Sequence, residues 1–150
     1  MTMAREAANL LADEFDLHSE VWSVPGWVQL HRDGSATDEH NRLAPGDEQR
    51  TAIVTELLDG SDAPVIAVTD FQRAVPQLIG RWIPAAYHTL GTDGFGVADT
   101  RPAARRHFGI DAQNIALTAL SALDADGHLD ATILADARQR FGAHLDAARR

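Results

Sequence analysis

A short apolar run, Pro64-Val65-Ile66-Ala67-Val68-Thr69-Asp70, constrains the fold of this chain more than any other segment. Its central residues are apolar without the polar alternation that a half-exposed strand shows. Such a run is typical of a strand buried on both faces, as in a parallel sheet covered by helices. We therefore expect an α/β architecture if further strands alternate with helices along the chain.

Such alternation is visible on both sides of this strand. Val21-Trp22-Ser23-Val24 is a short β-prone run that Pro25-Gly26 stops, and Tyr87-His88-Thr89-Leu90 is the next strand candidate. Helices are expected near the N-terminus, over residues 27–32 and 53–58, around Pro76 with an end at Pro84, and after Asp111 and Asp130, with residues 33–47 as a polar surface connection. The sequence thus predicts a layered α/β domain with a mostly parallel sheet.

Helical spacing also predicts the core. Asp111 and Asp130 are suited to cap the last two helices, because a carboxylate can accept from the free amides of a first turn. The residues expected to face inward are Ala7, Leu10, Leu11, Phe15, Ile115, Ala119, Leu120, Leu123, Ile133, Leu134, Ala137 and Phe141.

The charge balance and the absence of cysteine exclude several classes of function. The chain carries 22 acidic and 13 basic residues, a formal charge of -9, which opposes sequence-independent binding to nucleic acid. Without cysteine there is no disulfide framework, thiolate nucleophile or cysteine-ligated metal site. No apolar stretch reaches the roughly 20 residues of a membrane span, and no signal sequence follows Met1. We expect a cytoplasmic domain that binds neither nucleic acid nor a membrane.

The segment Gly91-Thr92-Asp93-Gly94-Phe95-Gly96 is the feature most similar to a cofactor-binding loop. Its spacing is G-x-x-G-x-G, whereas a dinucleotide fingerprint needs G-x-G-x-x-G before a helix. A phosphate-binding P-loop would need a lysine, and the chain has none. We interpret the segment as a chain reversal between a strand and a helix, with glycine where the backbone passes closely.

A basic cluster follows this loop. Asp99-Thr100-Arg101-Pro102 is typical of a helix start, with Asp99 or Thr100 as the cap, and Arg105 and Arg106 come one turn later. Such arginines could hold a phosphate or a carboxylate, although pairing with the abundant carboxylates, or a place at an interface, is favoured. The candidate interface or anion loop consists of Asp93, Gly94, Phe95, Gly96, Asp99, Arg101 and Arg105.

No other motif assembles catalytic or metal-binding machinery. Asp124 to Asp130 is similar to a calcium loop, but Leu129 and Ala135 stand where an EF-hand needs glycine and glutamate. The seven histidines lack the helical spacing of metal ligands, and there is no G-x-S-x-G elbow. Asp70 is expected either at the ligand-binding edge of the sheet or at the cap of the next helix. We expect no catalytic, cofactor-binding or metal-binding residue.

Several segments, taken in order, resemble one family. Residues 6–11 (EAANLL), 21–24 (VWSV) and 41–46 (NRLAPG) come first, followed by 67–76 (AVTDFQRAVP) and 82–84 (WIP). The stretch LGTDGFG at 90–96, followed by DTR at 99–101, is the most specific. From about residue 4 to about residue 141, the chain resembles the C-terminal domain of the homodimeric-type pyruvate dehydrogenase decarboxylating component, a thiamine-diphosphate-dependent, transketolase-like family.

This resemblance implies a three-layer α/β/α domain, the third domain of a transketolase-like subunit. In that family the two preceding domains hold thiamine diphosphate and magnesium across a dimer interface, so this chain itself would hold no cofactor. The family decarboxylates pyruvate and transfers the acetyl group to lipoyl groups of an acyltransferase. The implied partners are the remainder of the dehydrogenase subunit, its dimer mate and the lipoyl acyltransferase component.

The sequence departs from the family pattern on its N-terminal side. It lacks the motif that would hold magnesium and diphosphate, and it lacks the glycine-containing strand that precedes the first helix in the family. We therefore expect residues 1–150 to form a single truncated domain without its first central strand. Loss of such a strand leaves backbone groups unpaired, so we expect marginal stability or association that supplies a substitute strand.

Three functional hypotheses follow. In the first, the chain is a structural and assembly domain of pyruvate dehydrogenase and is non-catalytic alone. In the second, it is a free-standing interaction module that docks through the glycine loop, residues 91–96, and the Arg101–Arg106 face. In the third, that face binds an anion and the chain is a regulatory domain. Transketolase itself is a lesser alternative family, because its C-terminal domains share the fold but not this loop sequence.

Overall fold

A computed structural model describes residues 1–147, except for the side chains of Asp47 and of residues 143–147. Helices precede, separate and follow two short strands. In chain order the elements are α1 (Thr2–Phe15), α2 (Trp27–Leu43), the 3-10 helix η1 (Gly46–Glu48), α3 (Ile53–Leu58), β1 (Val65–Val68), α4 (Ala74–Gln77), the 3-10 helix η2 (Gly80–Trp82), β2 (Tyr87–Leu90), α5 (Arg101–His107), α6 (Ala112–Ala125) and α7 (Ala131–Ala147).

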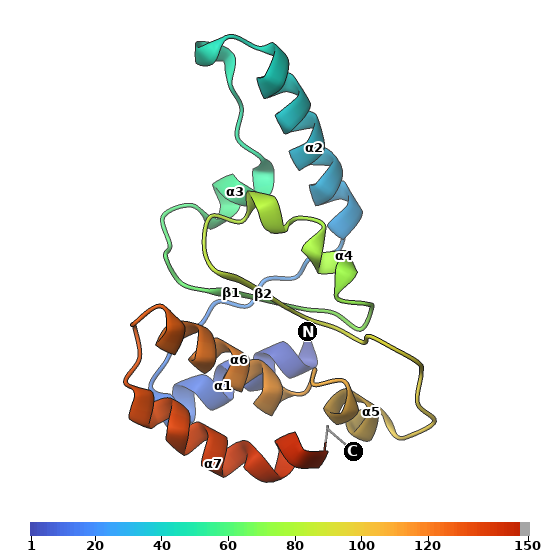
Figure 1. The fold of residues 1–150 in the computed structure, drawn as a ribbon, viewed down its shortest axis with the longest axis vertical. Helices are drawn as coiled ribbons and strands as arrows, with labels where there is room; N and C mark the ends of the chain where they lie inside the picture. The colour runs from blue at the N-terminus through green and yellow to red at the C-terminus, as the bar shows by residue number, and fades with distance from the viewer. Residues whose placement is uncertain (148–150) are drawn as a thin grey trace.

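The two strands form a parallel sheet, which has no further strand in the described part of the chain. The register pairs Val65 with Tyr87 and Val68 with Leu90. In Figure 1 the sheet lies between two helical layers, with α2, α3 and α4 on one side and α1, α5, α6 and α7 on the other. The prediction of a three-layer α/β/α domain with a parallel sheet is confirmed.

The larger hydrophobic cluster lies on the α6 side of the sheet. α6 is its centre, because α1, α7 and β1 all pack against that helix. Ile66, Val68 and Leu90 reach the cluster from the strands. Apart from Leu123, the inward-facing residues expected from helical spacing lie in this cluster or pack against it. Its buried members are Ala7, Leu11, Ala112, Ile115, Ala116, Leu120, Leu134, Ala137 and Phe141.

A smaller cluster lies on the opposite side of the sheet. Its buried members are Ala52, Val54, Ile79 and Trp82, and Tyr87 packs against them from β2. Because the strands contribute side chains to clusters on both faces, the sheet is covered on both sides, as the apolar run predicts.

The helix expected over residues 27–32 is longer than predicted. α2 continues to Leu43, so most of the polar connection expected over 33–47 is helical and the prediction there was wrong. The helix projects from the body of the domain (Figure 1). Among the described residues of α2 only Gly34 is buried, where its backbone faces the indole ring of Trp82.

Side chains of α2 fasten this polar helix to the rest of the domain. Asp33 Oδ2 accepts from the backbone amide of Ile53 at 2.8 Å. The Trp82 indole N–H donates to Asp38 Oδ1 at 3.2 Å. These bonds come from segments distant in sequence, which explains why the local pattern alone does not predict the helix.

Two further expectations were wrong. Residues 21–24 form no strand, and Trp22 is 53% exposed, because no neighbouring backbone pairs with this run. The single helix expected to end at Pro84 is divided into α4 and η2. The division falls just before Gly80, where the ring of Tyr87 lies close to the backbone.

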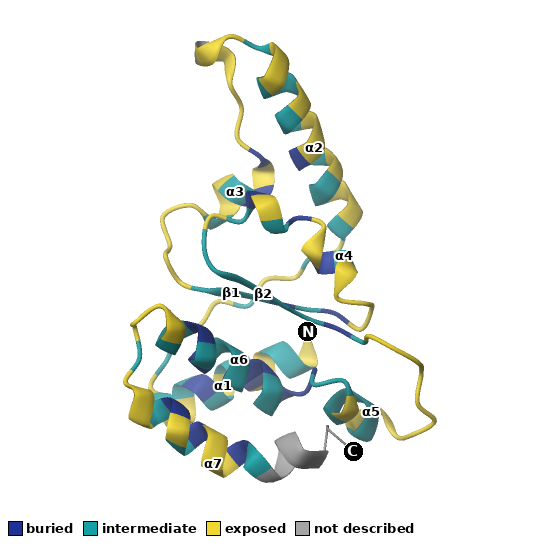
Figure 2. Cartoon of the chain, viewed as in Figure 1, coloured by how far each residue is buried: buried dark blue, intermediate teal, exposed yellow. Residues whose placement is uncertain are grey.

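Both predicted aspartate caps of the last two helices are confirmed. Asp111 Oδ1 accepts from the Asn114 amide at 2.9 Å, and Asp130 Oδ1 accepts from the Thr132 amide at 2.9 Å. Between the helices the turn uses Gly127 at a φ of 73°. Figure 2 shows many of the buried residues in α1, α6 and α7, whereas α2 is divided between exposed and half-buried residues and most of the loop after β2 is exposed. Within residues 1–147, no helix is long and apolar enough to cross a membrane.

Candidate functional site

The candidate site lies where β1 and β2 leave the sheet at the same edge. The Thr69 amide donates to the Leu90 carbonyl at 3.0 Å, next to the last residues of the strands. Beyond it, the Thr92 amide donates to the Phe71 carbonyl at 2.8 Å, and Thr92 Oγ1 donates to the Asp70 carbonyl at 2.9 Å. The two loops are therefore hydrogen-bonded to each other directly after the strands.

Gly91 has to be a glycine at this crossing. A Cβ atom there would lie 2.6 Å from the Phe71 carbonyl oxygen and 2.7 Å from the Arg73 nitrogen, closer than real Cβ atoms approach. Gly94 is needed for another reason, because its φ of 97° lies in the region that glycine favours. The interpretation of the loop as a chain reversal with close backbone passage is confirmed at Gly91.

Asp93 holds the start of the neighbouring loop. Its Oδ1 accepts from the backbone amide of Arg73 at 2.9 Å, and its Oδ2 accepts from the guanidinium Nε of the same residue. The backbone amide of Arg73, followed by its guanidinium, lowers the pKa of Asp93. Asp93 is thus engaged inside the chain by both oxygens.

Two aromatic side chains stand exposed beside these fixed loops. Phe95 is 96% exposed between Gly94 and Gly96, and Phe71 is 67% exposed in the loop after β1. Large aromatic side chains in contact with water on a fastened backbone are typical of interaction surfaces rather than of a domain interior. The glycine loop therefore presents apolar surface and keeps its carboxylate for internal contacts.

The basic residues of α5 lie on the other side of the strand ends. Arg101 and Arg105 line a shallow pocket of about 370 Å³ together with Asp70 and Thr92. Arg105 Nη2 lies 3.9 Å from Asp70 Oδ2, a long ion pair in which the aspartate side chain is 75% exposed. Such an exposed pair contributes little to stability, so both groups remain accessible to a ligand.

The structure divides the predicted site residues into separate groups. Arg101 and Arg105 share the pocket, whereas Asp93 is directed to Arg73. Phe95, Gly94 and Gly96 are exposed in the loop between them. Asp99 Oδ1 accepts from the Thr100 amide at 2.6 Å, but no side chain caps α5, so only the position of this helix start was predicted correctly.

Asp70 and Thr92 belong to the pocket although sequence reasoning did not select them as site residues. The sequence indicates Asp70 through its position directly after a strand of a parallel sheet. Of the two positions expected for this residue, the structure shows the sheet edge, because no side chain caps α4. Nothing in the local sequence indicates Thr92, because its role depends on the facing loop. Among the side chains that the structure describes, no three His, Asp or Glu residues lie together so as to hold a metal ion.

Comparison with known proteins defines the class. Residues 1–111 match the family model described as the transketolase-like TK C-terminal domain, and the chain belongs to that family. The match includes both strands, the crossing at Gly91 and all of α5.

Individual curated relatives show which kind of protein within this family the chain resembles. The chain is 45% identical over 141 residues to the pyruvate dehydrogenase E1 component of Mycolicibacterium smegmatis, a match that covers 94% of this chain and 15% of the relative. It is 46% identical over 140 residues to the protein of that name from Mycobacterium tuberculosis, covering 93% and 15%. It is 36% identical over 143 residues to that of Escherichia coli, covering 95% and 16%. The chain therefore corresponds to the C-terminal region of these larger subunits.

Proposed function

We propose that the chain is the C-terminal structural and assembly domain of a pyruvate dehydrogenase E1 component and is non-catalytic alone. The parent enzyme oxidatively decarboxylates pyruvate in the cytoplasm and transfers the acetyl group to lipoyl groups. Residues 1–150 act as a single domain of that enzyme. Its partners are the remainder of the subunit, the dimer mate and the lipoyl acyltransferase component.

One observation carries this proposal. The glycine loop is fastened by Asp93 and Thr92, and what it presents to solvent is Phe95 at 96% exposure. A loop built to bind a charged cofactor would instead direct its polar groups outward. An aromatic side chain on a fixed backbone is suited to insert into an apolar pocket of another domain.

The sheet supports the same role. The Val65 amide donates to the Ala86 carbonyl just before β2, and the Thr69 amide donates to the Leu90 carbonyl. By the alternation of a parallel ladder, the amides of Ile66 and Val68 therefore face the opposite edge of β1. No described strand pairs with that edge. We propose that this edge pairs with a further strand, supplied by the remainder of the subunit or by a partner chain.

Thiamine diphosphate and magnesium belong, in this proposal, to the other domains of the parent enzyme. The described residues contain no group of carboxylates or histidines placed to hold a metal ion, so we derive no step of the reaction through this chain. What its residues do is fix the two loops at the sheet edge and present Phe71 and Phe95.

A second candidate function is supported by the pocket of Arg101 and Arg105. Two guanidinium groups beside Thr92 could bind a phosphate or carboxylate, which would make the chain an anion-binding regulatory domain or a free-standing interaction module. Saturable binding of inorganic phosphate that disappears in Arg101→Ala would favour this function. A change in the activity of an intact E1 component on addition of the chain would favour the interaction module.

Complementation tests the assembly role. The Mycolicibacterium smegmatis E1 component, shortened by the region that this chain matches, is mixed with the chain, and pyruvate decarboxylation is measured with thiamine diphosphate and magnesium. We expect activity to return with the wild-type chain and to fall at least about tenfold with Phe95→Ser, since a buried aromatic anchor contributes about 2 kcal/mol or more.

Leu43→Ser is the matched control for this experiment. Leu43 is 70% exposed at the far end of α2, so its replacement removes a similar apolar surface away from the glycine loop. Equal losses in both variants would contradict the assignment of the loop as the contact. Absence of both binding and recovered activity with a folded wild-type chain would contradict the assembly role itself.

A further inference from the structure

Aspartate followed by glycine is the sequence at which a main chain rearranges most readily by itself. Glycine has no Cβ atom, so its amide nitrogen approaches the side-chain carbonyl carbon of the preceding aspartate without obstruction. The chain contains four such pairs, which are Asp33-Gly34, Asp59-Gly60, Asp93-Gly94 and Asp126-Gly127. The reacting atoms are the same in all of them, so the surroundings of each pair decide which one reacts.

Two of the pairs have a glycine amide that is already hydrogen-bonded. Gly34 lies inside α2, where its amide belongs to the helical ladder and the indole ring of Trp82 faces its backbone. The Gly127 amide donates to the Asp124 carbonyl at 3.1 Å in the turn between α6 and α7. Because such an amide must lose its hydrogen bond before the nitrogen can attack, both pairs are protected.

At the third pair it is the aspartate that is held. Asp93 accepts from the backbone amide and the guanidinium of Arg73, and these contacts lower the pKa of Asp93. An ionised carboxylate is a poor target for a nucleophile, because the reaction expels the hydroxyl group of a neutral carboxyl. Asp93-Gly94 is therefore protected through its side chain.

Asp59-Gly60 has neither form of protection. The pair follows α3 in a loop whose residues 59–63 are all exposed. Among the residues that the structure describes, none forms a hydrogen bond or an ion pair with the Asp59 carboxylate, and none accepts from the Gly60 amide. No atom lies within 4 Å of the position that a Cβ atom on Gly60 would take. Asp59 has a ψ of 148°, so ring closure requires rotation about its Cα–C bond, which an exposed loop permits.

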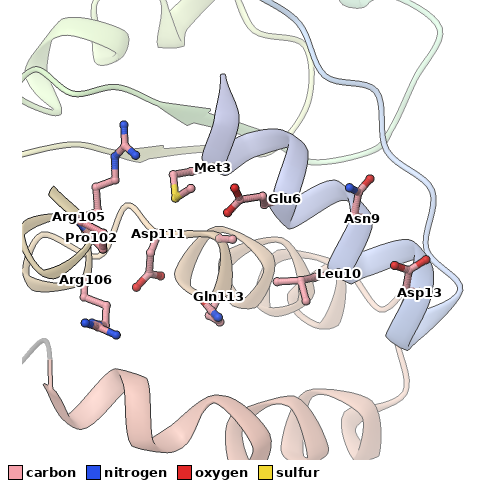
Figure 3. A pocket seen from close by; sticks show the side chains of 11 residues that line it. Met3, Glu6, Asn9, Leu10, Asp13, Pro102, Arg105, Arg106, Asp111 and Gln113 are labelled. Carbon is pink, nitrogen blue, oxygen red and sulfur yellow. The ribbon is translucent and has the colours of Figure 1, made fainter.

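Exposure alone does not select a site of this kind. Asp13 is exposed as well, and Figure 3 shows its carboxylate on the surface of α1. The next residue is Glu14, whose side chain obstructs the approach and whose amide lies within the helix. What distinguishes Asp59 is the combination of exposure, a glycine neighbour and an amide at that glycine that donates to no described residue.

We propose that Asp59-Gly60 is a site of spontaneous isoaspartate formation. The Gly60 nitrogen attacks Cγ of the neutral Asp59 carboxyl group and forms a C–N bond, while the hydroxyl group leaves with the amide proton as one water molecule. The resulting succinimide ring then takes up one water molecule. Opening at one carbonyl restores aspartate, and opening at the other leaves the main chain running through Cβ and Cγ of residue 59, with a free α-carboxylate. This site does not depend on the assembly role proposed above.

The product adds one carbon atom to the main chain between α3 and β1. None of residues 59–63 belongs to either hydrophobic cluster or packs against one. We therefore expect the midpoint of thermal unfolding to stay unchanged, so isoaspartate accumulates in the folded chain.

Ageing of the folded chain for weeks at neutral pH, followed by digestion with trypsin, tests the proposal. The chain has no lysine, and its arginines place the four pairs in four different tryptic peptides, of which residues 51–73 carry Asp59. An isoaspartyl peptide has an unchanged mass and a different chromatographic retention, so each pair is measured separately. We expect isoaspartate to accumulate in peptide 51–73 at least about tenfold faster than in the other three.

Unfolding in urea is the control for the local sequence. The protecting hydrogen bonds are then lost, and all four pairs should react at similar rates. Asp59→Glu is the decisive variant, because glutamate keeps the charge but would have to close a larger ring, so isoaspartate should disappear from peptide 51–73. Asp62→Glu makes the same exchange before Ala63 in the same loop and should leave the rate unchanged.

Two results would overturn the proposal. One is a rate in peptide 51–73 of the folded chain that is no higher than in the other three peptides. The other is isoaspartate that persists in this peptide after Asp59→Glu, which would place the reaction at Asp62 or Asp70. Neither result bears on complementation of an E1 component, so the two proposals fail separately.

Discussion

The indole ring of Trp82 faces the backbone of Gly34 so closely that a Cβ atom on this glycine would fall under 3.0 Å from three ring atoms. Gly34 lies inside α2, where glycine is intrinsically less favourable than alanine by about 1 kcal/mol. The close packing therefore outweighs helix propensity at this position. It joins the projecting helix to the smaller hydrophobic cluster, of which Trp82 is a member.

Gly34→Ala should consequently destabilise the chain. Overpacking costs about 1–3 kcal/mol, more than the propensity gain, so we expect a net loss of about 1–2 kcal/mol in the free energy of unfolding. Gly142→Ala in α7 is the matched control, because nothing lies within 4 Å of a Cβ there. It should stabilise by about 0.5–1 kcal/mol. Urea unfolding of both variants measures the difference, and equal effects of the same sign would contradict this packing.

Gly91→Ala should be more damaging than Gly96→Ala, although both positions lie in the same loop. At Gly91 the added carbon meets backbone atoms of Phe71 and Arg73, which cannot move without breaking the Thr92–Phe71 hydrogen bond. We expect a loss of about 2 kcal/mol or more. At Gly96 the space is open, and the change should stay within about 0.5 kcal/mol. Thermal unfolding compares the two, and similar midpoints would show that the loops do not cross as described.

Tyr87 should make the fold sensitive to alkaline pH. Burial raises the pKa of its hydroxyl, which donates to the Pro76 carbonyl at 2.8 Å. Because the folded pKa exceeds the unfolded value of about 10, the protonated form stabilises fully below pH ~10 and this contribution is lost as the pH rises further. The chain has one tyrosine and no lysine, so little else titrates there.

The tyrosinate absorbance band therefore reports on Tyr87 alone. We expect this band to appear together with loss of structure in the wild type. Tyr87→Phe should cost about 1 kcal/mol at neutral pH and abolish most of the alkaline dependence of the urea midpoint. A band that titrates near pH ~10 in the folded chain would contradict the burial of this hydroxyl.

Asp93 should contribute to acid lability. Arg73 lowers its pKa, so the carboxylate stabilises the fold above the unfolded value of about 3.9 and this contribution is lost as the pH falls through the folded-state pKa. Stability measured from pH ~7 down to pH ~3 should decline less steeply in Asp93→Asn than in the wild type. Asp62→Asn, at an exposed residue outside these contacts, is the control and should follow the wild type.

The sequence predicts a helix or strand well where its pattern of apolar residues results directly from the way the element packs. The apolar strand over 65–68 and the apolar faces of α1, α6 and α7 are examples, since contact with the hydrophobic clusters selects apolar residues at these positions. α2 is different. Its residues after Arg32 are mostly polar and include Gly34, and they are held by hydrogen bonds from Ile53 and Trp82, which no local window contains.

In the candidate site, too, features set by local residue type were predictable, whereas features set by contacts between distant residues were not. The glycine at the loop crossing was expected from its residue type, because only glycine permits such close backbone passage. The engagement of Asp93 with Arg73 was not predictable, since it joins residues twenty positions apart through the geometry of two loops. The cap that Asp111 forms on the Asn114 amide was predictable, by contrast, because the two residues lie within one turn of the chain.

The larger cluster draws its helices from opposite ends of the chain, α1 from one end and α6 and α7 from the other. On a ribosome, α1 emerges long before the helices that cover its apolar face. The smaller cluster, by contrast, is complete once Tyr87 has been made. The middle of the chain can therefore fold first, while Ala7 and Leu11 stay exposed until α6 has been synthesised. During that interval the apolar face of the first helix is in contact with water, and a translation product that stalls before α6 would leave it so.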